Sequence, residues 1–136
     1  MDPADVVAIQ QLYALYGHVM DDRDWERLPE VFTEDCVFDA TALGVPLMEG
    51  LAAVAATTET SDATPLAHHV TNVFVDGTSG DVARVRAKAI GIYTKGRAFS
   101  GDYEDTLVRT RAGWRIRHRL NRPPPIRRRP PELSPS

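Results

Sequence analysis

Apolar residues in the first 60 positions follow helical spacing. Between positions 5 and 20 they recur every three or four residues, which predicts one amphipathic helix with an apolar stripe. The stripe consists of Val6, Ile9, Leu12, Tyr13, Tyr16, Val19 and Met20. Asp24 is a suitable N-cap for a second, short helix over 25–32, and an alanine-rich helix is expected over 49–58. A short strand over 36–41 separates these last two helices.

After Pro65 the pattern changes from helical spacing to alternation. Strands are predicted over 66–76, 82–94, 97–110 and 114–121, joined by glycine-containing turns. The third of these strands is expected to be broken near Gly101. Four consecutive strands joined by short turns favour a curved antiparallel sheet with the helices on one face, which is an α+β fold.

The length of the chain suits one domain. It has 136 residues, of which 43% are hydrophobic and 26% are charged, as in ordinary globular proteins. We assign this domain to residues 1–121. The remaining segment, 122–136, contains six prolines and three consecutive arginines, a composition that predicts a mobile tail.

The composition argues against several classes of protein. No apolar run approaches the roughly 20 residues that a membrane-spanning helix needs, and the acidic first residues do not suit a secretory signal. Cys36 is the single cysteine, so an internal disulfide and a cysteine-rich zinc site are both excluded. We therefore expect a cytoplasmic protein that does not associate with membranes.

Charge is distributed unevenly along the chain. Residues 1–80 carry fourteen acidic and two basic side chains, a balance of −12, whereas residues 81–136 carry five acidic and fourteen basic ones, a balance of +9; the sum is the net charge of −3. Such asymmetry can indicate nucleic-acid binding. Because the whole chain is acidic, we favour a fold in which the later strands lie against the acidic early segments.

Two adjacent histidines are the first candidates for chemistry. Side chains alternate along a strand, so His68 and His69 face opposite sides of the sheet. Strict alternation places Val70, Asn72 and Phe74 on the face of His68. If that face turns toward the helices, His68 lies over a cavity; in the other register His69 does. The alternative to a functional role is a histidine that is half-buried and simply hydrogen-bonded to a neighbouring group.

Asp21 and Tyr16 are the candidates from the first helix. A carboxylate bonded to an imidazole selects its tautomer and stabilises its protonated form, which makes histidine a base near neutral pH. Asp21 lies beside the apolar stripe, with Asp22 and Asp24 as alternatives, and helix capping is the structural role open to all three. Tyr16 either donates a hydrogen bond to a developing oxyanion or belongs to the core.

The remaining motifs give no sign of a cofactor. The sequence has no glycine-rich phosphate loop, no HExxH pair and no Gly-x-Ser-x-Gly elbow, so we expect neither a metal nor a cofactor. The last strand alternates an apolar face with a basic one, composed of Arg115, Arg117, Arg119 and Asn121. This basic face could contact an anionic ligand, RNA or a subunit, or form ion pairs with Asp102, Glu104 and Asp105 on the preceding strand.

Taken in order, several short segments resemble the SnoaL-like branch of the nuclear-transport-factor-2-like superfamily. They are IQQLYALY at 9–16, MDDRDW at 20–25, LPEVFTED at 28–35, HHVTN at 68–72, GDYED at 101–105 and GWRI at 113–116, followed by Arg119. The resemblance covers roughly residues 4–122. It implies a cone-shaped fold, in which a strongly curved antiparallel sheet and three N-terminal helices enclose an apolar pocket.

The resemblance also implies roles for individual residues. Members such as scytalone dehydratase, bile-acid 7α-dehydratase and polyketide cyclases include enzymes that use an aspartate–histidine pair without a cofactor. Here the pair matches Asp21 and His68, with Tyr16 as the third catalytic residue. The expected substrate-binding residues are Asn72, Arg119, Tyr103, Trp25 and Phe38.

This chain departs from the enzymes it resembles at three places. Met20 and the region of Ile92 replace a tyrosine and a second histidine of scytalone dehydratase. Tyr16 replaces a lysine of hexachlorocyclohexane dehydrochlorinase, another member of the family. The expected function is therefore a cofactor-independent lyase, isomerase or cyclase acting on a small hydrophobic oxygenated molecule of the polyketide, steroid or terpenoid class. The alternative is a non-catalytic ligand-binding or association module. A homo-oligomer is expected, a dimer or a trimer, with nucleic acid as a disfavoured partner.

Overall fold

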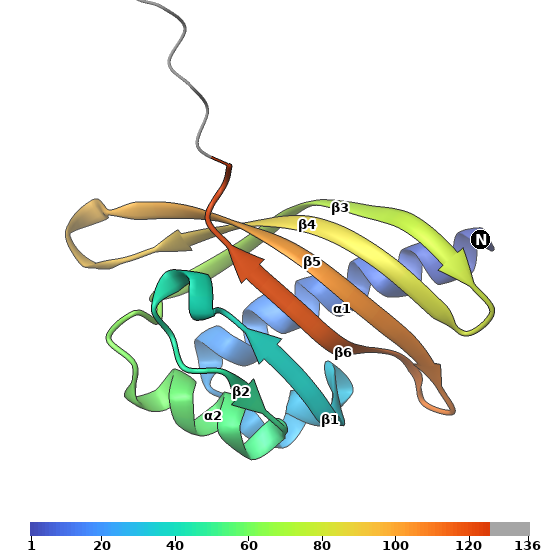
Figure 1. Ribbon diagram of the computed structural model, residues 1–136, viewed down its shortest axis with the longest axis horizontal. Coiled ribbons are helices and arrows are strands. Elements are labelled where there is room, and N and C mark those ends of the chain that lie inside the picture. The colour runs from blue at the N-terminus through green and yellow to red at the C-terminus, as the bar shows by residue number, and fades with distance from the viewer. Residues whose placement is uncertain (126–136) are drawn as a thin grey trace, which may run out of the picture.

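The computed structural model describes residues 1–125 and has an α+β fold (Figure 1). Two α-helices, α1 (Pro3–Asp22) and α2 (Leu51–Thr60), accompany three short 3-10 helices, η1 (Trp25–Glu30), η2 (Thr41–Leu43) and η3 (Thr94–Gly96). The strands are β1 (Phe32–Asp39), β2 (Met48–Glu49), β3 (Ala67–Ser79), β4 (Val82–Ile92), β5 (Ala98–Thr110) and β6 (Gly113–Arg122). The predicted order of elements is confirmed.

All six strands form one sheet in the order β2-β1-β6-β5-β4-β3. Strands β3 to β6 pair antiparallel with their sequence neighbours, as predicted. The sheet is nevertheless mixed, because β1 pairs parallel with β6, and the expectation of a purely antiparallel sheet was wrong. A parallel pair needs a long connection, and the chain between β1 and β6 supplies it. The break expected near Gly101 is also absent, because β5 is continuous from Ala98 to Thr110.

Helix α1 lies across one face of the sheet (Figure 1). It begins where the Asp2 side chain accepts a hydrogen bond from the backbone N–H of Ala4, and it ends at Arg23, which adopts a left-handed φ of 52°. Its apolar stripe is buried in the core. At Gly17 a Cβ would lie 3.1 Å from the carbonyl oxygen of His68, so glycine allows the helix to approach β3 closely at the histidine.

The second helical segment is a 3-10 helix rather than the predicted α-helix over 25–32. Pro29 lies inside it and cannot donate a backbone hydrogen bond, and the segment is only six residues long. Because this helix ends early, β1 begins at Phe32 instead of at position 36. Helix α2 begins at Leu51, two residues after the predicted start, because Met48 and Glu49 form β2.

Two bulges interrupt the alternation of side chains on which the predicted faces depend. At Asn72, which has a φ of 54°, the register of β3 against β4 shifts, and the inner face continues with Val73 and Val75 while Asn72 and Phe74 are exposed. Arg117 is the extra residue of a second bulge in β6. Beyond it Arg119 turns inward, so the continuous basic face predicted for this strand does not exist.

Ion pairs connect the acidic first half of the chain with the basic second half. Asp5 on α1 accepts from Arg109 on β5 at 2.8 Å, and Asp35 on β1 lies 3.2 Å from Arg117 on β6. These contacts support the interpretation that the charge asymmetry is used within the fold. The predicted tail beyond residue 125 lies outside the described residues. No helix among residues 1–125 is long and apolar enough to cross a membrane.

Candidate active site

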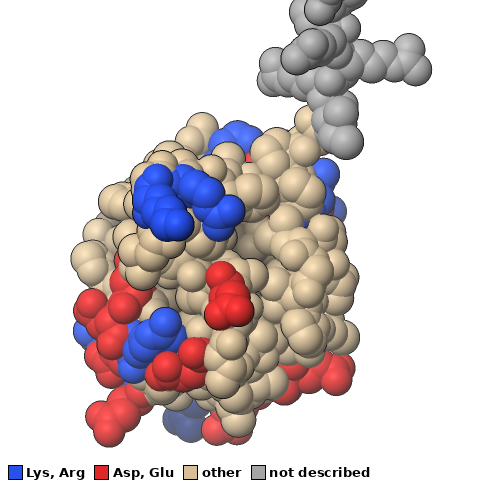
Figure 2. Space-filling model, turned by 90° about the vertical axis from the view of Figure 1, so that its left-hand side faces the viewer, with Lys and Arg blue, Asp and Glu red and all other residues tan. Residues whose placement is uncertain are grey.

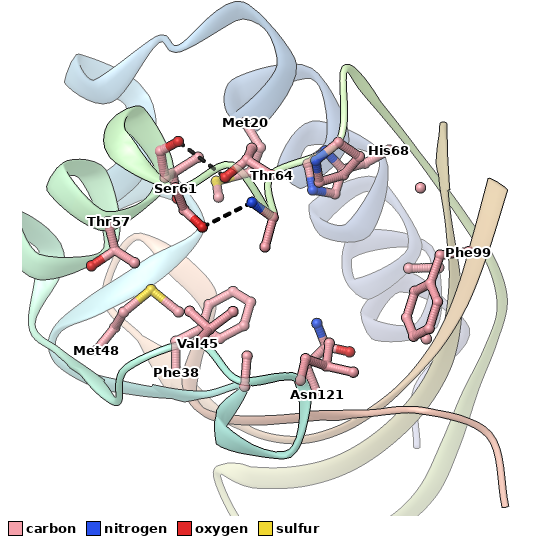
Figure 3. A pocket seen from close by; sticks show the side chains of 18 of the residues that line it. Met20, Phe38, Val45, Met48, Thr57, Ser61, Thr64, His68, Phe99 and Asn121 are labelled. Atoms are coloured by element: carbon pink, nitrogen blue, oxygen red, sulfur yellow. Dashed lines mark hydrogen bonds between the residues drawn. The ribbon is translucent and has the colours of Figure 1, made fainter. Parts of the chain in front are cut away.

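A cavity of about 260 Å³ lies between the end of α1, the α2–β3 loop and the sheet. Its walls are mainly apolar, and Figure 3 shows side chains converging on it from these elements. The apolar lining includes Met20, Phe38, Ala40, Leu43, Val45 and Met48. Space for the cavity exists where β4 and β5 carry the small residues Ala89, Gly91 and Gly101 on the inner face of the sheet.

The cavity opens to solvent between the α2–β3 loop and the hairpin that joins β4 to β5. Ala63 of the loop and Phe99 of the hairpin both line the cavity and are exposed. The hydroxyl of Tyr93 donates to the carbonyl oxygen of Ala63 at 3.0 Å and ties the two sides together. Figure 2 shows this end of the molecule, with basic groups at the top of the face, acidic groups mostly lower and to the left, and a large region without charge.

His68 and Asp21 meet at the wall of this cavity. The Nδ1 atom of His68 lies 2.6 Å from Oδ1 of Asp21, and the backbone N–H of His68 donates to both carboxylate oxygens at 3.0 Å. Asp21 belongs to the last turn of α1, not to the segment after it, and it binds β3 instead of capping its own helix. The imidazole is 8% exposed and the carboxylate 25% exposed.

This geometry determines which nitrogen of His68 can act as a base. An ionised carboxylate only accepts hydrogen bonds, so Nδ1 carries the proton and Nε2 has the lone pair. No group in residues 1–125 is hydrogen-bonded to Nε2, and the side chain lines the cavity. Burial lowers the pKa of His68 below 6.5, and the hydrogen bond that its Nδ1–H donates to Asp21 opposes this effect. The imidazole is therefore neutral at neutral pH and able to accept a proton.

Tyr16 and Tyr103 form a second polar group on the cavity. Their hydroxyl oxygens are 3.2 Å apart, and both residues line the cavity. Burial raises the pKa of each tyrosine, so both hydroxyls keep their protons. Of the two protons, one is used in the bond between the oxygens, and the other remains as a donor. The pair can thus present one O–H to a ligand.

Arg119 lies behind these tyrosines and does not reach the cavity. Its guanidinium is completely buried and donates to Asp105 at 2.8 to 3.2 Å, while Asp105 also accepts from the hydroxyl of Tyr13. The guanidinium carbon is 3.7 Å from the ring centroid of Tyr103 and 4.3 Å from that of Tyr16. These contacts make Arg119 a support for the two tyrosines, and the expectation that it binds substrate directly is not met by this geometry.

The other expected site residues divide into two groups. Phe38 and Tyr103 line the cavity. Trp25 does not, because its indole N–H donates to Glu59 at 2.9 Å and joins η1 to α2. Asn72 is exposed on the bulge of β3, outside the cavity. Among the described residues no cluster of His, Cys, Asp or Glu has the arrangement of a metal site.

Sequence reasoning missed Asn121, which the bulge of β6 turns into the cavity. It also missed the small residues of β4, although Ala83, Ala87, Ala89 and Gly91 fall on alternate positions of the sequence VARVRAKAIGI, with Val85 between the first two. Alternating small residues indicate a sheet face on which something must fit closely. That pattern could have located the floor of the cavity.

Comparisons with known proteins identify the family. A SnoaL-like domain matches residues 2–120, so the chain belongs to the SnoaL-like family. Among curated proteins none matches the chain in sequence.

Solved structures give the same fold. A candidate aromatic ring hydroxylase from Novosphingobium aromaticivorans is 32% identical, with a TM-score of 0.76 over 90% of this chain and 91% of that one. A candidate scytalone dehydratase from the same organism is 27% identical, with a TM-score of 0.68; the match covers 91% of this chain and 90% of that one. A third structure is a protein of unknown function with a cystatin-like fold from Nostoc punctiforme. It is 18% identical, has a TM-score of 0.77, and the match covers 92% of this chain and 95% of that one. The fold is thus the nuclear-transport-factor-2-like, or cystatin-like, fold.

Proposed function

We propose that the protein is a cofactor-independent lyase, isomerase or cyclase that removes a proton from a small, hydrophobic, oxygenated molecule. The observation that carries the proposal is the 2.6 Å contact between Asp21 and the imidazole of His68 at the wall of an apolar cavity. The pair leaves Nε2 of His68 without a hydrogen-bond partner among residues 1–125, on a side chain that lines the cavity. The similarity to a candidate scytalone dehydratase is consistent with it.

The proposed reaction begins at a carbon next to a carbonyl group. Nε2 of His68 takes the proton, the C–H electron pair forms a C=C bond, and the carbonyl π electrons move to the oxygen as an enolate. The tyrosine pair donates a hydrogen bond to that oxygen, and Asp21 stabilises the imidazolium. The proton then passes to a departing hydroxide in an elimination, or to another carbon in an isomerisation. In a ring closure the enolate carbon instead forms a bond to the carbon of a second carbonyl group, and the oxygen of that group takes the proton.

The size and lining of the cavity support the proposed class of ligand. A volume of about 260 Å³ suits a small molecule, and the apolar walls favour a carbon skeleton with few polar groups. Polyketides, steroids and terpenoids of this size fit the description. The alternative, a binding module without chemistry, uses the same cavity but does not require Nε2 of His68 to be accessible.

A model base-catalysed elimination distinguishes an enzyme from a binding module without chemistry. In 5-nitrobenzisoxazole, removal of the ring C–H proton forms a nitrile as the N–O bond breaks, and the nitrophenolate product is followed by absorbance. We expect the protein to accelerate this reaction relative to free imidazole, and His68→Gln to lower the rate by about 100- to 10,000-fold. A matched control is His69→Gln, because His69 is exposed on the other face of the strand.

Two results contradict the catalytic proposal. One is a wild-type rate no greater than that of an equal concentration of imidazole. The other is an unchanged rate in a folded His68→Gln variant, with folding checked by circular dichroism. Tight binding of 5-nitrobenzisoxazole together with either result favours the non-catalytic binding module.

We also propose that the protein forms a homodimer through the outer face of the sheet. Phe74 on β3 is 60% exposed and Ile90 on β4 is 39% exposed, although both belong to regular strands. Exposed apolar side chains on an open sheet face favour association. We expect a dimer mass in light scattering and a monomer for Phe74→Arg; a monomeric wild type contradicts the proposal.

A further inference from the structure

The hairpin that joins β4 to β5 carries two basic side chains at the mouth of the cavity. Lys95 and Arg97 are both exposed, and neither forms an ion pair with an acidic group in residues 1–125. Figure 2, which views this end of the molecule, shows basic groups at the top of the face. The entrance to an apolar cavity therefore has two cations that no acidic side chain of the described fold neutralises.

The backbone of the hairpin fixes the positions of these cations. The N–H of Tyr93 donates to the carbonyl oxygen of Arg97 at 2.8 Å and closes the hairpin. Lys95 and Gly96 turn the chain with φ values of 61° and 71°. Because a left-handed φ favours glycine or asparagine, the backbone conformation does not account for a lysine at the first of these positions. What Lys95 contributes to the hairpin is a charge at its tip.

Arg97 is connected to the cavity through an aromatic ring. Its guanidinium carbon lies 5.5 Å from the ring centroid of Tyr93, a contact that holds the cation over the face of the ring. Tyr93 lines the cavity, and so does Phe99, two residues beyond Arg97. A ligand that fills the cavity and extends outward past these two rings therefore reaches the guanidinium.

The opposite edge of the mouth has the opposite charge. Asp62 is exposed on the α2–β3 loop, whose neighbouring residues Ser61 and Ala63 line the cavity. An anionic group at the mouth is thus attracted to the hairpin and repelled by the loop, which gives the ligand one orientation. Since the whole chain has a net charge of −3, its overall field repels anions. Any preference for an anionic ligand must then arise from local cations.

We propose that Lys95 and Arg97 form a subsite for a carboxylate group of the ligand, whose apolar body fills the cavity. Arg97 can donate two parallel hydrogen bonds to a carboxylate, and Lys95 adds a compact charge on a flexible side chain. This inference rests on the proposed function and deepens it, because it narrows the substrate class to amphipathic acids. In such a molecule the reacting carbon lies in the apolar part near His68, and the carboxylate lies at the outer end.

Two ligands of nearly equal shape test the subsite without any catalysis. Naphthalene-2-acetate carries a carboxylate where naphthalene-2-acetamide carries a neutral amide, and isothermal titration calorimetry gives both dissociation constants. At low salt we expect the wild-type protein to bind the acid about 3- to 10-fold more tightly than the amide, as expected for two partly exposed ion pairs. The preference should shrink in about 0.5 M NaCl, because salt screens exposed charges.

Three variants locate the source of this preference. Lys95→Gln and Arg97→Gln are each expected to reduce it, and the double variant is expected to bind acid and amide equally while its affinity for the amide stays unchanged. The matched control is Arg111→Gln, which removes one exposed cation from the turn between β5 and β6, at the far end of the sheet from this hairpin (Figure 1). That variant is expected to keep the wild-type preference.

Several results would overturn the proposal. Equal binding of acid and amide by the wild type, or binding of neither at millimolar concentration, means that no carboxylate subsite exists at this mouth. An unchanged preference in the double variant means that another cation binds the carboxylate. An equal reduction in Arg111→Gln means that the preference comes from total charge. None of these results bears on whether His68 removes a proton, because 5-nitrobenzisoxazole is neutral and the elimination assay decides that question separately.

Discussion

Two carboxylates beside the same cavity have opposite roles. Asp21 holds an imidazole that reaches the cavity, and both side chains keep some exposure, 25% and 8%. Asp105 holds a guanidinium, and both are completely buried, with the tyrosine rings between them and the cavity. The difference shows that access decides function here: an ion pair that a ligand can reach is available for chemistry, whereas a sealed one supports the residues in front of it.

The largest expected effect on stability comes from the buried ion pair of Asp105 and Arg119. In Arg119→Met the carboxylate of Asp105 stays buried without its cation, which typically costs about 3–5 kcal/mol of unfolding free energy. Urea denaturation followed by tryptophan fluorescence measures the loss. A variant as stable as the wild type would show that Asp105 does not depend on Arg119, and the comparison between the two carboxylates would fail.

Loss of the pair formed by Asp21 and His68, which a ligand can reach, is expected to lower activity more than stability. Asp21→Asn keeps an acceptor for the backbone N–H of His68 but loses the charge that stabilises the imidazolium. We expect the elimination rate to fall on the order of 100-fold, with a loss of about 1–2 kcal/mol in unfolding free energy. The matched control is Asp22→Asn, since Asp22 is adjacent and exposed; an equal loss of rate in both variants would contradict a specific role for Asp21.

His68 is also expected to make the unfolding free energy of the protein depend on pH. Because burial lowers its pKa in the folded state, the unfolded chain takes up a proton first as the pH falls. Stability contributed by the neutral imidazole is therefore complete above about 6.5, the pKa of an unperturbed histidine, and is lost as the pH falls through the lower folded-state value.

His68→Gln removes this component of the pH dependence. We expect the unfolding free energy of the wild type to decrease more than that of the variant between pH 7.5 and pH 5. The measurement is urea denaturation of both proteins across this range. Parallel curves would mean that the folded state does not disfavour protonation of His68.

The smallest effect concerns a carboxylate on the surface. Hydrogen bonds from Arg109 and Trp114 lower the pKa of Asp5 from 3.8 to about 2. Its contribution to stability is present above pH 3.8 and is lost as the pH falls toward 2. Asp5→Asn is expected to make acid unfolding slightly less steep in that range, and an identical acid transition in the variant would show that the ion pair contributes nothing measurable.

Local patterns predicted most of the elements because their faces are formed by neighbouring residues. The stripe from Val6 to Met20 becomes the buried face of α1, and alternation after Pro65 becomes β3 to β6. Patterns failed where one residue changes the register. The bulges at Asn72 and Arg117 reverse the faces of β3 and β6, and the parallel pairing of β1 with β6 depends on contacts distant in sequence.

The candidate site could be predicted only in part for the same reason. The pairing of Asp21 with His68 came from the family resemblance, since no spacing rule connects residues 47 positions apart. Strict alternation placed Arg119 and Asn121 together on a basic face of the last strand, because it ignores the bulge before them, and only the resemblance gave Arg119 a role in substrate binding. The inward position of Asn121 depends on that bulge, which no pattern in the sequence announces.

The central claim is that His68 is a neutral base whose Nε2 faces the cavity. Two-dimensional NMR of the ¹⁵N-labelled imidazole during a pH titration tests it directly, because it reports the tautomer and the pKa of that ring. We predict a proton on Nδ1, an unprotonated Nε2 at pH 7 and a pKa below 6.5. A proton on Nε2 at neutral pH, or a pKa above 6.5, would contradict the account.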